Sequence, residues 1–394
     1  MKLFGLCAAA ALLAPSAFAQ APSPPIEIDY LGLKVERTLQ LAYLDQPPPD
    51  AGLQGARVAL ADNQTTGQFL NQTFHLTEDM ADDAAGIVDA FKKRVAAGTK
   101  LFVTDLPAPI LLQVADLPEA KGVTLLDATT HDDSLRAESC RRNVLHTAPS
   151  RAMLADALMQ YMMTKKWGKI ALVIGGDPED KLYAEAIRNA AHKFRIKIVK
   201  EIPWTFDPGS RRTDTGAYAE EAEVARITQD VGDYDLLVVA DEADNFGDEL
   251  GYRTTEPRPV AGTQGLVPSA WARPFEQWGA TQLQSRFLKA TNRWMTDNDY
   301  GAWLAVRSVG EAATRGNTTD PAKIGEFMRS KDFDVAGFKG TKLTFRDWDG
   351  QLREPLLLAD AHSLVSVSPQ PGFLHQFSEL DTLGVDRPET KCHM

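Results

Sequence analysis

The chain has 394 residues, with 42 Lys and Arg against 54 Asp and Glu, which gives a formal net charge of −12. Its composition, 44% hydrophobic and 24% charged, is that of an average globular protein and excludes a disordered chain or a membrane bundle. This length predicts two domains rather than one core. The acidic surplus argues against nucleic acid as a partner, because binding phosphates requires a basic surface.

The first twenty residues have the pattern of an export signal. Lys2 supplies a positive charge, residues 3–13 are almost wholly apolar, and Ala17-Phe18-Ala19 places small residues where a signal peptidase reads them. We therefore expect Sec-type cleavage after Ala19, with residues 1–19 as signal peptide and a soluble mature protein in the periplasm. The apolar segment is too short to predict a transmembrane helix.

Export decides how the three cysteines are interpreted. Cys7 lies in the leader and precedes most of its apolar run, which argues against a lipid-modified cysteine. Cys140 and Cys392 then remain in a compartment where disulfides persist, and we expect them to pair with each other. A metal or catalytic role needs partners at ligand spacing, and only His393 lies next to one of them.

Short apolar runs alternate with segments of helical periodicity along the chain. Residues 20–55 are expected to form a leader and a connector, the latter stiffened by Pro47-Pro48-Pro49. Strands are predicted over 56–61, 100–104, 123–127, 144–147, 170–174, 196–202, 236–240 and 259–262. Helices are predicted over 67–97, 109–117, 150–165, 180–194, 218–231, 281–294 and 300–315. A closing hairpin is predicted over 343–358, with its turn at Asp349-Gly350.

This alternation of strands and helices predicts an α/β fold whose parallel sheets carry helices on both faces. It occurs in two blocks, 56–146 and 170–262, and so predicts two Rossmann-like lobes. Open parallel sheets bind ligands beyond the carboxyl ends of their strands. We therefore expect the ligand in a cleft between the lobes.

Polar side chains that follow the predicted strands are the first candidates for this cleft. Residues 62–67 offer hydroxyl and amide groups at a helix N-terminus, although simple helix capping needs the same residues. Acidic and histidine side chains within 127–133 could bind a metal or cap a helix. Their spacing matches no known set of metal ligands, which favours helix capping. The candidates of this kind are Asn63, Thr65, Thr66, Asp105, Thr129 and Asp241.

Arginine and tryptophan side chains are the second set of candidates. Guanidinium groups recognise carboxylates in a planar, bidentate manner, so Arg142, Arg151 and Arg211 indicate an anionic ligand. An intramolecular ion pair is the alternative for each of them. Trp271 and Trp303 are candidates for stacking on a flat conjugated ligand, although core packing is the default for Trp303 at its helical spacing.

Several enzyme motifs are missing from the sequence. It contains no Gly-x-Ser-x-Gly nucleophile elbow, no Walker phosphate loop, no paired-histidine zinc signature and no Rossmann glycine fingerprint. Nothing in the local sequence positions a Ser, His and Asp for catalysis, and we expect no catalytic residues, no catalytic cofactor and no bound metal.

Three segments resemble parts of a known family. Residues 144–155 (VLHTAPSRAMLA), 299–306 (DYGAWLAV) and 343–351 (LTFRDWDGQ) are similar to the first crossover, the returning helix and the third crossover of type I periplasmic binding proteins of the branched-chain amino-acid class. The resemblance implies two lobes that close like a flytrap around three hinge crossings, near 146–147, 262–263 and 340–341. It also implies lobe 1 as 26–146 plus 263–340, lobe 2 as 147–262 plus 341–365, and a tail, 366–394, tied to lobe 1.

A narrower resemblance indicates one branch of this family. Segments 28–32, 47–50, 55–67 and 207–212 are similar to the branch that accompanies alcohol dehydrogenase systems dependent on pyrroloquinoline quinone (PQQ). This resemblance implies a periplasmic binding protein of an ABC-type transport system with PQQ, a flat tricarboxylate, as its ligand. It implies an ABC permease or a PQQ-dependent dehydrogenase as partner. We expect a monomer.

Two other functions stay open. In amino-acid-binding members of the family, a hydroxyl and an acidic pair hold the ligand, whereas the corresponding segments here read Thr104-Asp105-Leu106-Pro107 and Asp127-Ala128-Thr129. This difference argues against a plain amino acid. A binder of another small solute, such as an amino acid, an aromatic acid or an alcohol-derived metabolite, is the first alternative, and an exported hydrolase is the remote one.

Overall fold

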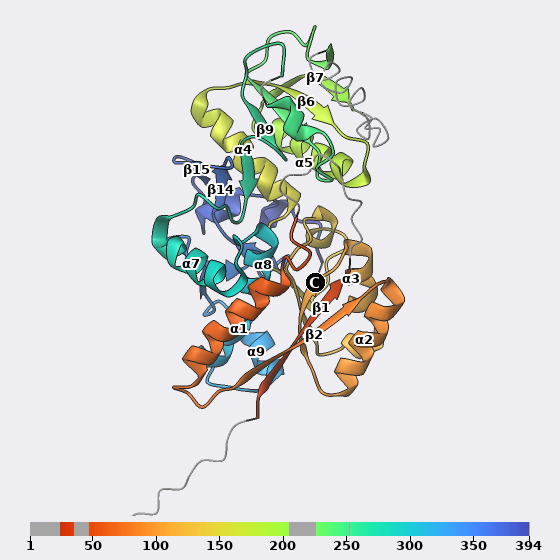
Figure 1. The fold of residues 1–394 in the computed structure, drawn as a ribbon, viewed down its shortest axis with the longest axis vertical. Helices are drawn as coiled ribbons and strands as arrows, with labels where there is room; N and C mark the ends of the chain where they lie inside the picture. The colour runs from red at the N-terminus through yellow and green to blue at the C-terminus, as the bar shows by residue number, and fades with distance from the viewer. Residues whose placement is uncertain (1–23, 35–46, 205–225, 252, 394) are drawn as a thin grey trace, which may run out of the picture.

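The computed structural model describes residues 24–34, 47–204, 226–251 and 253–393. These residues form two lobes arranged along the long axis of the molecule, each built on its own parallel sheet (Figure 1). The predicted α/β fold with two lobes and parallel sheets is therefore confirmed. The predicted signal peptide and Arg211 lie outside the described residues. Within the described part, none of the helices combines the length and apolarity needed to span a bilayer.

Lobe 1 contains a five-stranded parallel sheet in the order β2-β1-β3-β4-β5. Its strands are β1 (Ile26–Leu33), β2 (Phe74–Ala81), β3 (Leu101–Asp105), β4 (Thr124–Asp127) and β5 (Val144–His146). Alternate side chains along a strand point to opposite faces of the sheet. Ile28 and Val103 pack in one core with α1 (Leu53–Gly67), whereas Leu31 and Phe102 pack in a second core with α2 (Ala84–Ala96).

Lobe 2 contains a four-stranded parallel sheet in the order β7-β6-β8-β9. Its strands are β6 (Lys169–Ile174), β7 (Lys197–Pro203), β8 (Leu236–Ala240) and β9 (Val260–Gly262). The helices α4 (Arg151–Lys165) and α5 (Pro178–Lys193) pack on each other, and α5 contacts the sheet. The Ser150 side chain accepts from the backbone N of Met153, so it caps α4 as predicted.

The chain returns to lobe 1 after β9. It passes through β10 (Val267–Ser269) and α7 (Ala280–Thr291) to the long helix α8 (Asp297–Arg315), which packs along α1 (Figure 1). Gly55 permits this close packing, because a Cβ there would lie 1.8 Å from the backbone O of Asp299. Lobe 1 is therefore built from two segments of the chain that lobe 2 separates.

Two small antiparallel sheets, β10-β14-β15 and β11-β12-β13, complete the described strands. Their other strands are β11 (Val335–Ala336), β12 (Lys342–Phe345), β13 (Leu352–Arg353), β14 (Leu356–Ala359) and β15 (Leu364–Ser368). The remaining helical segments are α3 (Ala108–Ala115), α9 (Pro321–Met328), η1 (Pro118–Ala120), η2 (Asp133–Arg136), η4 (Gly247–Leu250), η5 (Gln277–Gly279), η6 (Glu379–Thr382) and η7 (Arg387–Glu389). The antiparallel pairing of β12 with β13 confirms the first part of the predicted hairpin.

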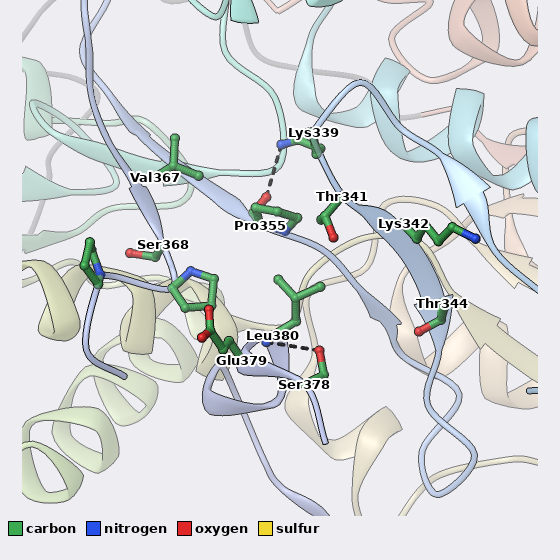
Figure 2. Close-up of a pocket in the computed structure, with 12 residues that line it drawn as sticks. Lys339, Thr341, Lys342, Thr344, Pro355, Val367, Ser368, Ser378, Glu379 and Leu380 are labelled. Atoms are coloured by element: carbon green, nitrogen blue, oxygen red, sulfur yellow. Dashed lines mark hydrogen bonds between the residues drawn. The ribbon is translucent and has the colours of Figure 1, made fainter. Parts of the chain in front are cut away.

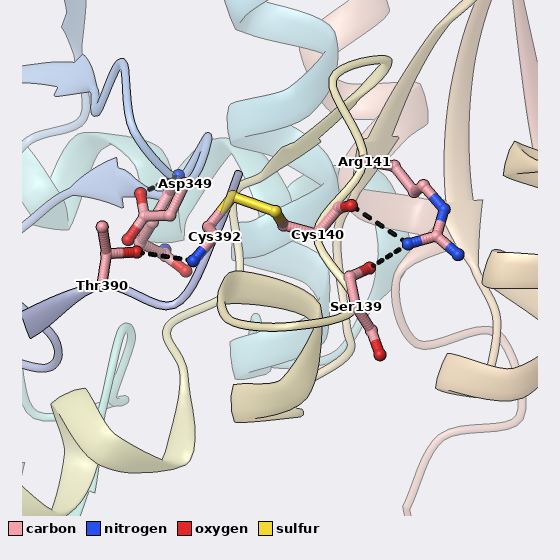
Figure 3. The surroundings of a disulfide bond; sticks show 7 residues. Ser139, Cys140, Arg141, Asp349, Thr390 and Cys392 are labelled. Carbon is pink, nitrogen blue, oxygen red and sulfur yellow. Dashed lines mark hydrogen bonds between the residues drawn. A yellow bond between two sulfur atoms is a disulfide. The ribbon is translucent and has the colours of Figure 1, made fainter. Parts of the chain in front are cut away.

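A disulfide joins Cys140 to Cys392, as the cysteine count predicts (Figure 3). The two residues are 252 positions apart in the sequence. The bond therefore fixes the last residues of the chain to the segment that precedes β5.

The predicted strand over 56–61 is wrong, because these residues lie within α1. The segment is rich in Ala and Leu, which favour helix. Ala56, Ala59 and Asn63 recur at helical spacing and are buried in the interface with α8. Residues 62–67 are therefore the last turns of a helix and not a loop between a strand and a helix.

The predicted helix over 67–97 is wrong in its first half. Residues 74–81 form the edge strand β2, and only 84–96 form α2. The sequence of β2 contains Glu78 and Asp79. Acidic residues are depleted in strands, so this segment was not predicted as one. In the structure Arg57 pairs with Glu78 at 2.6 Å and Arg94 pairs with Asp79 at 2.5 Å, so the acidic side chains are accommodated.

The expected leader and connector, 20–55, contains an element that the sequence did not indicate. Residues 26–33 form β1, which pairs with both β2 and β3. Asp29 and Gly32 interrupt its apolar run, and Asp29 is fully buried. An interior strand was therefore missed because it carries a buried charged residue.

Candidate functional site

Polar side chains that follow strands of the two sheets meet at the start of α4. Asp132 follows β4 in lobe 1, Glu242 follows β8 in lobe 2, and Arg151 is the first residue of α4. Nε and Nη2 of Arg151 donate to the carboxylate oxygens of Glu242 at 2.8 and 2.6 Å, and Nη1 donates to Oδ2 of Asp132 at 3.1 Å. The carboxyl edges of both sheets converge here, which makes this region the candidate binding cleft.

Arg151 is held as a paired cation. Only 4% of the residue is exposed, and burial by itself disfavours the charged guanidinium. Hydrogen bonding to Glu242 and the charges of Glu242 and Asp132 outweigh burial and raise the pKa of Arg151 above its usual range. An anionic ligand at this position therefore has to compete with Glu242 for the guanidinium.

Hydroxyl and carboxylate side chains lie together at the cleft edge of lobe 1. Oδ2 of Asp105 accepts from the Tyr30 hydroxyl at 2.9 Å, and its Oδ1 accepts from the Thr129 hydroxyl at 2.8 Å. Burial, and then the charge of Asp105, raise the pKa of Tyr30 well above its usual range, so the phenol stays a donor. Gly52 packs beside them with φ of +85°, and a Cβ there would lie 2.5 Å from the Tyr30 hydroxyl oxygen.

At the cleft edge of lobe 2, carboxylates accept hydrogen bonds from backbone N–H groups. Asp241, at the end of β8, accepts from the backbone N of Asn245, Phe246 and Gly247 at 2.7–2.9 Å. Asp180 in α5 accepts from the backbone N of Glu242 at 2.7 Å. Burial raises the pKa of Asp180 to about 6. These bonds fix the loop after β8 onto the start of α5.

The partly exposed polar side chains of the two edges are mostly acidic. They are Asp105, Thr129, His131, Asp132, Asp177, Glu242, Asp244 and Asn245. Such a surface favours a ligand that donates hydrogen bonds or carries a positive charge. Across the described residues, no three His, Cys, Asp or Glu side chains come together in a way that could hold a metal ion.

Four of the residues singled out in the sequence lie at these edges. They are Asp105, Thr129, Arg151 and Asp241: Asp105 ends β3, Thr129 and Asp241 follow strands, and Arg151 opens α4. Asp241 is buried and caps its own loop. Arg151 has the intramolecular ion pairs that the sequence left as the alternative. A role for any of the four in binding stays a prediction.

Asn63, Thr65 and Thr66 do not lie at the cleft edges. All three lie in the second half of α1, which runs away from the carboxyl edge of the sheet. Nδ2 of Asn63 donates to the backbone O of Val306 in α8 at 2.8 Å, and the two threonine hydroxyls donate to backbone carbonyls one turn earlier in α1. Their polar groups are therefore used within lobe 1.

Arg142 lies at the opposite edge of the lobe 1 sheet. It precedes β5, so it is at the amino ends of the parallel strands, and its backbone O accepts from Arg329. The sequence placed it by its distance from a crossover along the chain, which does not tell one edge of the sheet from the other.

Trp271 and Trp303 pack in the core on either side of Tyr300. The ring centres are 4.7 Å apart for Trp271 and Tyr300 and 6.1 Å apart for Tyr300 and Trp303, with interplanar angles of 20° and 13°. Both tryptophans are at most 3% exposed, and Nε1 of Trp303 donates to Oδ2 of Asp62 at 3.0 Å. Core packing describes both tryptophans, and for Trp303 it is the default that the helical spacing indicated.

Tyr30, Asp180 and Glu242 lie at the cleft but were not among the residues singled out in the sequence. Tyr30 lies in β1, which was not predicted as a strand, and segment 28–32 was noted only for its family resemblance. Glu242 follows Asp241 directly after the correctly predicted strand 236–240, and its position could have identified it. Asp180 was interpreted only as the start of a helix.

A cavity of about 450 Å³ lies apart from this cleft, between β12 and the C-terminal tail (Figure 2). Its lining residues are Lys339, Thr341, Lys342, Thr344, Pro355, Val367, Ser368, Pro369, Pro371, Ser378, Glu379 and Leu380. Nζ of Lys339 donates to the backbone O of Pro355 at 3.2 Å (Figure 2). None of the side chains singled out in the sequence lines this cavity.

Comparison with known proteins gives a family match over part of the chain. Residues 50–232 match the family described as periplasmic binding protein. No curated protein matches the sequence.

Solved structures match nearly the whole chain at low sequence identity. A periplasmic binding protein from Burkholderia mallei is 15% identical with a TM-score of 0.66, over 93% of this chain and 98% of that chain. A leucine-, isoleucine-, valine-, threonine- and alanine-binding protein from Brucella ovis, in a closed conformation, is 14% identical with a TM-score of 0.65, over 88% and 93%. An ABC transporter solute-binding protein from R. palustris in complex with benzoate is 11% identical with a TM-score of 0.66, over 94% and 100%. The shared property is the two-lobed α/β fold, and none of these three is named as an enzyme.

Proposed function

We propose that this chain, whose residues 50–232 match the periplasmic binding protein family, is the solute-binding component of an ABC-type transport system in the periplasm. The observation that carries the proposal is the meeting of both sheet edges at Arg151, which bonds Asp132 of lobe 1 and Glu242 of lobe 2. A solute that enters between the edges contacts groups from both lobes, as a binding cleft requires. Its binding favours closure of the lobes.

PQQ is the specific ligand that we propose first, on the sequence resemblance to the PQQ-associated branch. Arg151 is a cationic residue at the cleft. A carboxylate of PQQ would bind its guanidinium in place of the Glu242 carboxylate. The two tryptophans proposed for stacking are buried against Tyr300, so Arg151 and the donors of the lobe 1 edge would hold the ligand. The partner is then either a permease for PQQ uptake or a PQQ-dependent dehydrogenase that receives its cofactor.

A small solute with an ammonium or several hydroxyl groups is the second candidate. It is favoured by the acidic side chains at both edges, which include Asp105 and Asp177, because carboxylates accept from such donors. Among proteins of the same fold, the one from Brucella ovis is named for leucine, isoleucine, valine, threonine and alanine, and the one from R. palustris is named as a complex with benzoate. Amino acids, which carry an ammonium and a carboxylate, and benzoate, which carries only a carboxylate, are thus named for proteins of this fold.

Calorimetric titration of the purified mature protein with PQQ, leucine and benzoate tests the choice. If PQQ is the ligand, heat is released at micromolar PQQ, and the Arg151→Met variant loses binding whereas Arg142→Met retains it. Arg142 is the matched control because it lies at the far edge of the same sheet. No heat with PQQ but heat with leucine selects the second candidate, and no heat with any small solute contradicts the proposed function.

The partner needs a separate experiment. Protein loaded with PQQ is mixed with a PQQ-dependent alcohol dehydrogenase that has been freed of cofactor. Restored activity at a rate above that of free PQQ supports delivery to the dehydrogenase. A rate equal to that of free PQQ leaves uptake through a permease as the route.

A further inference from the structure

The C-terminal tail, residues 369–393, is held against lobe 2 by polar contacts. The backbone N of Gly384 donates to Oδ2 of Asp156 in α4 at 2.8 Å. Nζ of Lys193 in α5 donates to Oδ2 of Asp156 at 2.7 Å and to the backbone O of Gly384 at 3.0 Å. Nε2 of Gln160 in α4 donates to Oγ1 of Thr382 at 3.0 Å. The tail is thus fixed to the two main helices of lobe 2.

The same tail is fixed to the hairpin between β12 and β13. Oδ1 of Asp381 accepts from Nε of Arg346 at 3.0 Å and from Nε of Arg353 at 2.8 Å, and the side chains of Asp381 and Arg346 are each 1% exposed. The guanidinium groups of Arg346, Arg353 and Arg387 lie 5.0–5.2 Å from the ring centre of Trp348. A buried ion-pair network with an aromatic centre therefore joins the tail to this hairpin.

The far end of the tail is bonded to lobe 1. Cys392 forms its disulfide with Cys140, which lies between η2 and β5 (Figure 3). The next residue, Arg141, pairs with Asp116 at the end of α3 at 2.5 Å, and Nδ2 of Asn143 donates to the backbone of α3 at 3.1 Å. Cys140 is therefore anchored in the body of lobe 1.

We propose that the tail is a strap that joins the two lobes across the hinge, beside the crossings of the main chain, and limits how far the lobes open. The tail is attached to lobe 2 by noncovalent contacts and to lobe 1 by the disulfide. It can restrain lobe opening only if both attachments hold. The strap is complete only where the disulfide forms, which is an oxidising compartment. This inference goes beyond the proposed function and does not depend on which solute is bound.

A disulfide also stabilises a fold by restricting the unfolded chain, and the experiment has to separate the two effects. Hydrogen exchange is followed by mass spectrometry in peptides over 144–151 and 346–356, in the wild type and in the Cys140→Ser/Cys392→Ser variant. We expect exchange about tenfold faster in these segments without the disulfide, with unchanged exchange in β6. Small-angle scattering is expected to give a larger radius of gyration. If the variant does not fold, folded wild-type protein is reduced, alkylated and measured in the same way.

A second variant tests the noncovalent end. Lys193→Met removes the donor to Asp156 and Gly384 with the disulfide intact, and Lys181→Met, at an exposed lysine of the same helix, is the matched control. Faster exchange in 346–356 with Lys193→Met but not with Lys181→Met supports the strap. Unchanged exchange with Lys193→Met overturns a two-ended strap. The serine variant can also overturn the strap. If its melting temperature falls but its hydrogen exchange and radius of gyration are unchanged, the disulfide acts only by restricting the unfolded chain.

Discussion

Arg151 and Glu242 form a bidentate ion pair in which both donor–acceptor distances are 2.8 Å or less. The pair lies where the edges of the two lobes meet, and Asp132 of lobe 1 accepts a third bond from the same guanidinium. Glu242 therefore occupies the face of Arg151 that an anionic solute needs. The charge balance of the cleft depends on this one carboxylate more than on the net charge of −12.

Glu242→Gln is expected to raise the affinity for an anionic solute about tenfold and to lower stability by about 1–3 kcal/mol. The amide leaves the buried guanidinium with a weaker partner, which destabilises the fold but frees the cation for a ligand. Titration with PQQ or benzoate and urea unfolding measure the two effects. Glu185→Gln, in an exposed pair with Arg188, is the control and is expected to change stability by less than about 0.5 kcal/mol. Equal effects of both substitutions would contradict the assignment of the cleft.

Thr129→Val is expected to weaken solute binding by about 1 kcal/mol, roughly fivefold, because Asp105 loses the hydroxyl bonded at 2.8 Å. Thr65→Val, at the far end of α1, is the matched control and is expected to leave affinity unchanged. Isothermal titration with whichever solute binds provides the comparison. A loss of affinity with Thr65→Val would instead restore the end of α1 as part of the site.

Gly55→Ala is expected to lower the free energy of unfolding by about 2–3 kcal/mol or to prevent folding. The added Cβ would lie 1.8 Å from the backbone O of Asp299, and a backbone atom cannot move aside as a flexible side chain can. Gly168→Ala is the control, because a Cβ at Gly168 meets no atom within 4 Å. Urea unfolding of the two variants checks the prediction, and similar midpoints would show that α1 and α8 pack less closely than described.

The free energy of unfolding is expected to pass through a minimum near pH 8. Burial raises the pKa of Glu354 from 4.5 to about 8, so the folded state binds more protons than the unfolded state between these values, and stability falls as pH rises. Burial lowers the pKa of Lys339 from 10.5 to about 8, so stability rises again from pH 8 to 10.5.

Glu354→Gln is expected to make the falling limb less steep and to stabilise the protein at pH 8 by about 1–3 kcal/mol. A slope remains, because burial also raises the pKa of Asp29 to about 8. Urea midpoints measured from pH 5 to 10 give the curve, and the Lys339→Met variant serves as the complementary measurement because it is expected to flatten only the rising limb. A wild-type curve without a minimum near pH 8 would contradict the burial of this pair.

The sheet of lobe 2 could be predicted from the sequence almost residue by residue. The predicted strands 170–174, 236–240 and 259–262 lie within one residue of β6, β8 and β9, because strands buried on both faces appear as unbroken apolar runs. The first half of lobe 1 could not be predicted in this way. Its β1 and β2 carry acidic residues whose arginine partners, such as Arg94, are far away along the chain.

The candidate site was only partly predictable for a similar reason. The rule that ligands bind beyond strand ends located Asp105, Thr129 and Asp241, because it needs only local sequence. Whether an arginine is free for a ligand depends on partners from other elements. Arg151 lies at the cleft but holds Glu242, which is 91 positions away, and the sequence contains no signal for that pairing.

The packing of α8 on α1 has a consequence for how the chain folds as it emerges. The buried face of α1, with Gly55 and Asn63, stays uncovered until the segment 297–315 is available, whereas α4 through β9 is one continuous stretch, 151–262. The sheet of lobe 2 can therefore form first, whereas α1 still lacks α8, and α4 still lacks β10, β14 and β15, which pack on it. Contacts of lobe 1 span more than 240 positions, so we expect its assembly to be slow, because such long loops have to close before the contacts form.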